Sequence, residues 1–240
     1  MTFYIGSIAA VPTGNQRKYV EHATAMWPVF QSRGATRMVE NWGVDVPKGK
    51  ITDFHRAVAA GDDEVAVFSW IEWPDKATAD AAWLEMDSDP AMQHMPEMPF
   101  DGKRMIFGGF APIFERGAHT GAAYCQGFTL AVPENKKSAY VAMAEKGWDL
   151  LSRNGALGII ENWGEDVPRG KQTDFYRATK CEEHEVPVFS WIAWPDRATC
   201  DAAAKAMQED SGDMDMSDMP FDGMRMMWAG FMPIFDSART

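Results

Sequence analysis

Two glutamates, Glu40 and Glu161, are the side chains best suited to acid–base chemistry. Glu40 has Met38 and Trp42 as neighbours at two-residue spacing. Residues two apart on a β-strand face the same side, so the spacing predicts a carboxyl group on an apolar face. Burial there raises the pKa of a carboxyl group that lacks a cationic partner. Such a group could act as a general acid or base near neutral pH.

An aspartate and an arginine form a second candidate set. Asp53 and Arg56 recur as Asp174 and Arg177. The planar guanidinium of Arg56 could hold a carboxylate or phosphate of a ligand. The alternative, which we favour, is that Arg56 pairs with Glu40 on a neighbouring strand and fixes a hairpin.

Arg104 and Arg225 follow an Asp-Gly pair that is typical of a tight turn. Each arginine could contact an anionic ligand, and Arg104 could instead pair with Glu40. Exposure at the end of its strand would also explain Glu40 without any function.

Amide and aromatic side chains on the expected strands form a third set. They could line an aromatic pocket with polar contacts, or be core or interface residues. The set consists of Asn41, Trp42 and Trp70 and their counterparts Asn162, Trp163 and Trp191.

Metal and cofactor sites are not expected. None of the five histidines or three cysteines occupies matching positions in two related segments, which disfavours a paired haem or zinc site. The methionine-rich segments 92–98 and 214–219 could suit Cu(I). Their methionines coincide only at 95/216 and 98/219, so methionine as a flexible core filler is the better interpretation.

The candidates occur in pairs because the chain contains one segment twice. ENWGVDVPKGKITDFHRA (40–57) recurs as ENWGEDVPRGKQTDFYRA (161–178), and VFSWI and MPFDGxRM recur at the same offset of 121 residues. We predict a first domain over 1–116, a linker over 117–122 and a second domain over 123–240.

Hydrophobic spacing predicts the elements that position these residues. In the first copy we expect strands over 3–11, 35–43, 65–73 and 103–114, helices over 14–33 and 75–86, and an extended segment over 52–58 that forms a hairpin with 65–73. The β-α-β-β-α-β order is ferredoxin-like. Its sheet leaves one apolar face uncovered, so two copies are expected to face each other as a pseudo-dimeric α/β barrel, an α+β fold.

The composition of the chain disfavours some classes of partner and location. The 240 residues carry a net charge of −12, which disfavours nucleic acid as a partner. No segment approaches the length of a membrane span, and the N-terminal segment does not resemble a secretory signal. All three cysteines lie in the second copy, so no shared disulfide is expected and a cytoplasmic location fits.

The motifs ENWGxDVPxGKxTDFxRA, VFSWI and MPFDGxRM resemble the DUF1428 family of bacterial proteins of unknown function, over nearly the whole chain, twice. The resemblance implies the dimeric α/β-barrel superfamily, which includes monooxygenases of antibiotic biosynthesis, haem-degrading enzymes and small isomerases. Members usually hold one domain. The fusion is therefore expected to form its pair within one chain, as a monomer or a further homodimer.

Two functions remain open. In the leading hypothesis the barrel binds a small, partly apolar organic molecule and could oxidise or isomerise it without a cofactor, with Glu40 and Glu161 as acid or base. Arg56 and Arg177 would then hold an anionic group. In the alternative, the protein is a non-catalytic binding or interaction module, because a fold alone does not determine function.

Overall fold

The computed structural model describes residues 1–90, 92, 95–210 and 219–239, and divides into a first repeat (β1–β4) and a second repeat (β5–β8). The first repeat contains β1 (Phe3–Pro12), α1 (Gln16–Gln31), β2 (Arg37–Asp45), α2 (Phe54–Ala57), β3 (Glu64–Trp73), α3 (Lys76–Ser88) and β4 (Ile106–Gly117). The second contains β5 (Tyr124–Pro133), α4 (Lys137–Arg153), β6 (Gly158–Asp166), α5 (Phe175–Ala178), β7 (Glu185–Trp194), α6 (Arg197–Asp210) and β8 (Met227–Asp236).

The strands form a closed antiparallel barrel in the order β1-β3-β2-β8-β5-β7-β6-β4. Within the first repeat, β3 pairs with both β1 and β2, and β7 does the same with β5 and β6. The repeats join at two places, where β2 pairs with β8 and β4 pairs with β6. The last strand of each repeat therefore completes the barrel against the other repeat.

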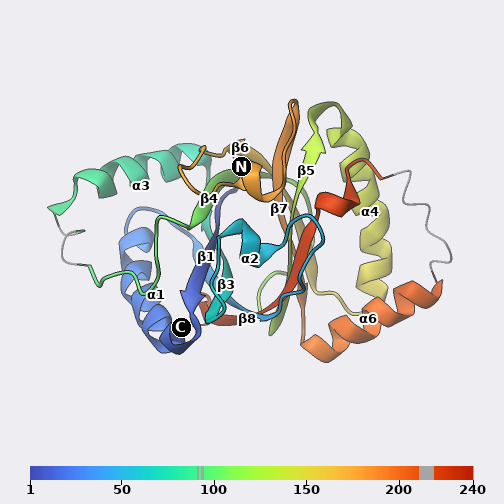
Figure 1. Cartoon of the computed structure of the whole chain (residues 1–240), viewed down its shortest axis with the longest axis horizontal. Coiled ribbons are helices and arrows are strands. Elements are labelled where there is room, and N and C mark those ends of the chain that lie inside the picture. Colours follow the sequence, from blue (N-terminus) through green and yellow to red (C-terminus); the bar gives the residue numbers. More distant parts are fainter. Residues whose placement is uncertain (91, 93–94, 211–218, 240) are drawn as a thin grey trace.

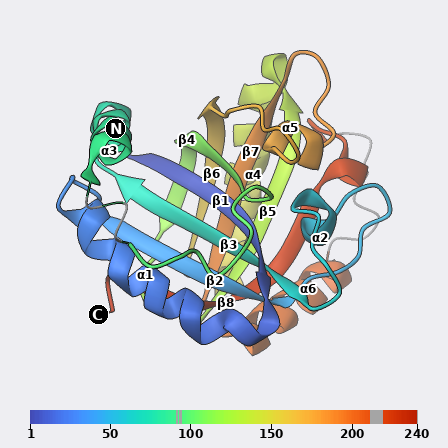
Figure 2. The ribbon, with the colours of Figure 1, turned by 60° about the vertical axis from the view of Figure 1, so that its left-hand side comes forward.

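The long helices cover the outside of the barrel. Figure 1 shows α1 and α3 on one side of the strands and α4 and α6 on the other. Figure 2 shows α1 running alongside the outer face of the sheet. The buried residues of α1 are Tyr19, Ala23, Met26 and Phe30, at the helical spacing that the sequence predicts. This arrangement creates a second apolar layer, between the helices and the sheet.

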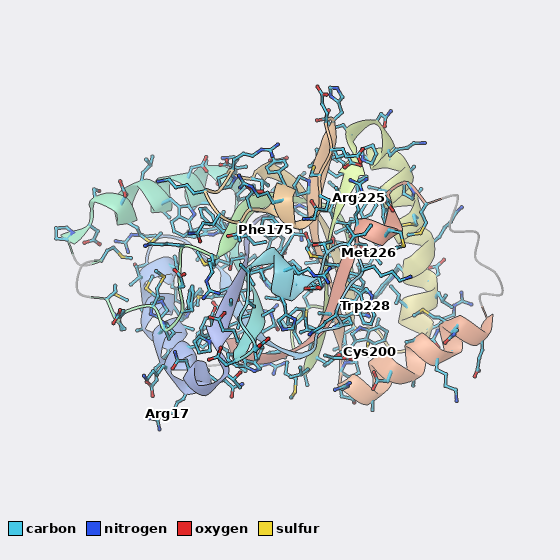
Figure 3. The ribbon with its side chains drawn as sticks, viewed as in Figure 1. Arg17, Phe175, Cys200, Arg225, Met226 and Trp228 are labelled. Carbon is cyan, nitrogen blue, oxygen red and sulfur yellow. The ribbon has the colours of Figure 1, made fainter. Side chains whose placement is uncertain are left out.

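Aromatic side chains fill the interior of the barrel. The rings of Phe68 and Phe189 stack with centroids 4.2 Å apart, and those of Trp70 and Trp191 stack at 4.1 Å. Gly6 makes room for this packing, because a Cβ there would lie 2.8 Å from the ring of Phe189. Side chains occupy the space between the two sets of helices, with Phe175 near the centre (Figure 3). The prediction that a ligand binds inside the barrel is therefore wrong, because side chains fill that space.

The prediction of an extended segment over 52–58 is also wrong. Phe54–Ala57 is the short helix α2, and the Asp53 side chain accepts a hydrogen bond from the backbone N–H of Arg56 at its start. The hairpin partner of β3 is β2. The final strand begins at Ile106, three residues later than expected. The predicted α+β pseudo-dimeric barrel of two ferredoxin-like repeats is confirmed.

Candidate functional site

Glu40 lies on the outer face of β2, beneath helix α1. Its Oε2 accepts hydrogen bonds from the Tyr19 hydroxyl, at 2.7 Å, and from the hydroxyl of Ser69, which is directly opposite on β3. A β-bulge in the pairing with β8 follows Glu40, where Asn41 faces Pro233. Glu40 is 7% exposed. The strand alternation predicted from the sequence therefore places this carboxyl group correctly on an apolar face.

No cation compensates for the burial of Glu40. Among the described residues, Glu40 has no ion pair, and Oε1 accepts no hydrogen bond. Burial raises the pKa of Glu40 to about 7, although the hydrogen bonds from Ser69 and Tyr19 act in the opposite direction. The predicted alternatives of an ion pair with Arg56 or Arg104, or of exposure at the strand end, are wrong. The carboxyl group can therefore exchange a proton near neutral pH.

The second repeat carries the same Glu–Tyr hydrogen bond, but the buried Ser190 hydroxyl has no hydrogen-bond partner among the described residues. The Tyr140 hydroxyl donates to Glu161 Oε2 at 2.5 Å, and Ser190 lies opposite Glu161 on β7. Burial raises the pKa of Glu161 as well. The buried Glu–Tyr pair is thus a feature of the repeat, and the surroundings must distinguish the two copies.

A cavity of about 360 Å³ lies between α1 and the sheet in the first repeat. Its walls are mainly apolar, and the polar side chains among them include Glu40, Tyr19, Ser69, Ser7 and His22. Its rim includes Trp83, Met98 and Phe107, which are between 41% and 48% exposed. The cavity is therefore open to small molecules and apolar at its entrance.

The matching cavity of the second repeat is smaller, at about 260 Å³. Phe128 lines it at the position of Ser7, and Met143 at the position of His22. Leu151 replaces Phe30. Phe128 takes up the space that Ser7 leaves open in the first cavity, and the loss of two polar side chains makes the second cavity less polar.

Sequence reasoning missed three contributors to the first cavity. Tyr19 fits the apolar stripe of α1, and only its phenolic oxygen signals a polar partner. Ser7 and His22 have no identical counterpart in the second repeat, and the comparison of repeats therefore set histidine aside. His22 is half-buried, burial lowers its pKa, and its buried Nδ1 has no partner among the described residues.

Arg56 and Arg177 are not beside the glutamates. Their side chains are about half exposed and pair with Asp53 and Asp174 respectively. Asp53 and Asp174 are buried and serve as N-terminal caps of α2 and α5. The prediction that Arg56 shares a cavity with Glu40, or pairs with it, is wrong because residues 54–57 form a helix rather than a strand.

Arg104 and Arg225 hold loops in place. Arg104 donates to both oxygens of Glu64 at 2.7 Å, and Arg225 does so to Glu185 at 2.7 and 2.8 Å. Each arginine also pairs with the acid of its Asp-Gly turn, Asp101 or Asp222. The donors of both arginines are thus already engaged within the protein.

The predicted aromatic and amide set divides between the two layers. Trp70 and Trp191 stack inside the barrel, where Asn41 and Asn162 donate to the carbonyl oxygens of Phe68 and Phe189. Trp42 and Trp163 lie in the clusters beside α1 and α4. The stacked tryptophans join the two repeats in the core, and Trp70 also borders the cavity beside Glu40.

The described residues hold no group of three or more histidine, cysteine, aspartate or glutamate side chains placed to share a metal ion. His94 and residues 214–218 of the methionine-rich segments lie outside the described residues. Within the described part of the chain, no helix has the length and apolar character needed to cross a membrane.

Comparisons with known proteins agree with this architecture. Residues 2–102 and 123–223 each match the family model described as a protein of unknown function (DUF1428). The uncharacterized protein YbaA of Escherichia coli strain K12 and that of Shigella flexneri are each 50% identical over 116 residues, which are 48% of this chain and 99% of theirs.

Solved structures share the fold at low sequence identity. An anthrone oxidase-like protein aligns with a TM-score of 0.57 at 12% identity, covering 98% of this chain and 92% of its own. A protein from Fusobacterium nucleatum classed provisionally as a monooxygenase aligns with a TM-score of 0.55 at 8% identity, covering 98% and 93%. With the two matched segments and the closed barrel together, the chain belongs to the DUF1428 family, as a tandem pair of its domain.

Proposed function

We propose that the cavity of the first repeat binds a small, largely apolar organic molecule and that Glu40 exchanges a proton with it. The observation that carries this proposal is a carboxyl group with a pKa near 7 in the wall of an apolar cavity of about 360 Å³. Such a cavity is at the small end of ligand sites in proteins, and a pKa close to the working pH suits general acid–base catalysis.

The two carboxyl oxygens of Glu40 have different surroundings and therefore different proposed roles. Tyr19 and Ser69 both donate to Oε2, which orients the carboxyl group and stabilises its charged form. Oε1, with no partner among the described residues, is the atom that would accept and return the proton. His22 lines the same cavity and would contact a polar group of the ligand.

The reaction class follows from this single proton-transfer group. Glu40 would remove a proton from a weakly acidic C–H or O–H bond next to a carbonyl or aromatic ring. Return of the proton at another atom gives an isomerisation, whereas reaction of the resulting anion with O2 gives an oxidation. The fold shared with an anthrone oxidase-like protein makes oxidation the first reaction to test. At 12% identity the shared fold assigns no role to individual residues.

Anthrone is a suitable test substrate because oxidation of anthrone by O2 yields anthraquinone and water, which balances without a further reagent. We expect oxygen uptake and anthraquinone formation by the wild-type chain, a loss of at least about 100-fold in Glu40→Gln, and near-normal rates in Glu161→Gln. Equal rates in Glu40→Gln and the wild type would rule out Glu40 as the proton acceptor.

Binding is tested separately from catalysis by filling the cavity. Ser7→Phe introduces the residue that the second repeat carries as Phe128. Native mass spectrometry of protein purified from its source should reveal a retained small molecule in the wild type and none in Ser7→Phe. Retention of the molecule by the wild type, with no turnover of anthrone, would favour the non-catalytic binding function. Retention by Ser7→Phe would contradict the assignment of the site.

A further inference from the structure

A groove of about 350 Å³ runs between the two repeats and borders the cavity beside Glu40, because Met105 and Phe107 line both. One wall is the segment Gly102–Phe107 of the first repeat, and the other is the loop Pro168–Asp174 of the second. The Thr173 hydroxyl donates to the carbonyl oxygen of Arg104 at 2.9 Å, which ties the two walls together. The corresponding Thr52 donates instead to the carbonyl oxygen of Ala178, at 2.6 Å.

The groove is positively charged although the chain is acidic. Lys103, Arg169 and Lys171 line it and are exposed. None of the three has a carboxylate within 4.0 Å among the described residues, whereas the nearby Arg104 and Arg177 are paired. The three cations come from both repeats, so they form no basic run in the sequence.

The one carboxylate in the lining does not neutralise these cations. Asp174 is 3% exposed. Its Oδ1 accepts from the backbone N–H of Arg177, and its Oδ2 accepts from the N–H of Gly170 and from the Arg177 guanidinium. Its charge is therefore committed to holding the loop, and the groove retains a positive potential.

The loop that carries Arg169 and Lys171 is held by hydrogen bonds to Asp174 and by the Arg169 guanidinium, which lies 3.9 Å from the centroid of the Tyr176 ring. A Cβ at Gly170 would lie 2.0 Å from the carbonyl oxygen of Thr173, so the turn is too tight for any other residue. A fixed loop loses little conformational entropy when it binds a ligand. The apolar surfaces of Phe107 and Pro168 border the cations.

We propose that this groove binds a small organic anion, with its carboxylate or phosphate against Lys103, Arg169 and Lys171 and its apolar part against Phe107 and Pro168. Guanidinium and ammonium groups supply charge-assisted hydrogen bonds to such anions. The proposal does not depend on proton transfer by Glu40, and the site is built by residues of both repeats.

The first repeat supplies a matched control. Its equivalent loop carries Lys48 and Lys50, but it has Ile51 in place of Gln172, and the facing residue is Met224 in place of Lys103. Arg169→Gln/Lys171→Gln and Lys48→Gln/Lys50→Gln therefore remove the same net charge from equivalent loops. Only the first of these double variants alters the proposed site.

Isothermal titration calorimetry with 1-naphthyl phosphate at low ionic strength tests the proposal. We expect saturable binding that weakens with added salt, a loss of about tenfold or more in Arg169→Gln/Lys171→Gln, and less than a twofold change in Lys48→Gln/Lys50→Gln. Lys103→Met should weaken binding as well. A parallel titration with 1-naphthoate distinguishes a phosphate site from a carboxylate site.

Three results would overturn the proposal. These are no binding of either anion, equal losses in the two double variants, or binding of uncharged 1-naphthol as tight as that of the anions. His22→Met, which alters the cavity beside Glu40 but none of the residues that line the groove, separates the two sites. Unchanged binding of naphthyl phosphate in that variant supports the groove, and its loss would assign the probe to the cavity instead. Failure of the anion site leaves the anthrone experiment unaffected.

Discussion

At the scale of single residues, the buried carboxyl group bears both on stability and on the proposed acid–base role. Glu40 and Glu161 each sit on an apolar face and accept a hydrogen bond from a tyrosine of the covering helix. Since the pair occurs in both repeats, it does not by itself define a site. The two cavities differ in the residues beside the glutamates. Ser7 leaves space in the first cavity where Phe128 fills it in the second, and His22 adds a polar group where the second cavity has Met143.

Replacing Glu40 should change how stability depends on pH. Burial raises the pKa of Glu40 from 4.5 to about 7 in the folded protein. Its contribution is therefore complete below about pH 4.5 and is lost as the pH rises through 7. In Glu40→Gln this loss is absent, so the variant should gain about 3 kcal/mol on the wild type between pH 4.5 and pH 8. Urea unfolding at a series of pH values measures the difference.

The control for this experiment is Glu161→Gln, which removes the equivalent group. Burial also raises the pKa of Glu161, so the same direction of change is expected. If the stability difference between Glu40→Gln and the wild type does not vary with pH, the carboxyl group is not protonated in the folded state near neutral pH, and the acid–base role fails with it.

At the scale of elements, the short helices α2 and α5 are held by their caps. Asp53 accepts from the backbone N–H of Arg56 at 2.8 Å and from that of Gly49 at 3.2 Å. The ion pair with Arg56 adds little, because the arginine side chain is 53% exposed. The invariance of Asp53 and Asp174 between repeats is therefore explained by backbone capping.

The cap and the ion pair can be separated by substitution. Asp53→Ala should lower the free energy of unfolding by about 2 kcal/mol, because it leaves two backbone N–H groups without their acceptor. Arg56→Ala should change it by less than about 0.5 kcal/mol. Chemical denaturation of both variants provides the measurement. Equal effects would mean that the ion pair, rather than the cap, holds α2.

Hydrophobic spacing predicts the helices and strands that have a clear apolar period. It does not predict a segment whose conformation depends on local hydrogen bonds. The stripe of α1 and the alternation around Glu40 were both sufficient to place those side chains. The segment TDFHRA read as extended because its apolar residues are few, while the cap at Asp53 makes it helical. No local pattern could indicate that aromatic rings would fill the barrel, since Phe68 and Phe189 lie in different repeats. The cavity beside Glu40 was therefore expected on the wrong side of the sheet.

At the scale of the whole molecule, the two joints between repeats are chemically different. At the β2–β8 joint, Arg37 donates to both oxygens of Asp236 at 3.0 and 2.8 Å, and also to the carbonyl oxygen of His119. Both charged residues are buried. At the β4–β6 joint the corresponding residues are Gly158 and Glu115, which cannot form such a pair. The duplicated barrel thus has one joint that is closed by a buried ion pair.

Breaking this pair should destabilise the whole molecule. Burial alone would raise the pKa of Asp236, but Arg37, the backbone N–H of Ala238 and Arg239 together lower it. The pair therefore stabilises the fold at neutral pH, and this contribution is lost as the pH falls through the lowered pKa. Among the described residues, Arg37→Met leaves the buried carboxylate with only the partly exposed Arg239 as cationic partner, so the free energy of unfolding at pH 7 should fall by about 3 kcal/mol. The double variant Arg37→Met/Asp236→Leu should recover much of the lost stability, since neither charge then remains unpaired. The control, Glu115→Gln at the other joint, should have little effect. Urea unfolding of the three variants measures these changes in the free energy of unfolding. If Arg37→Met is as stable as the wild type, strand pairing and aromatic packing alone close the barrel.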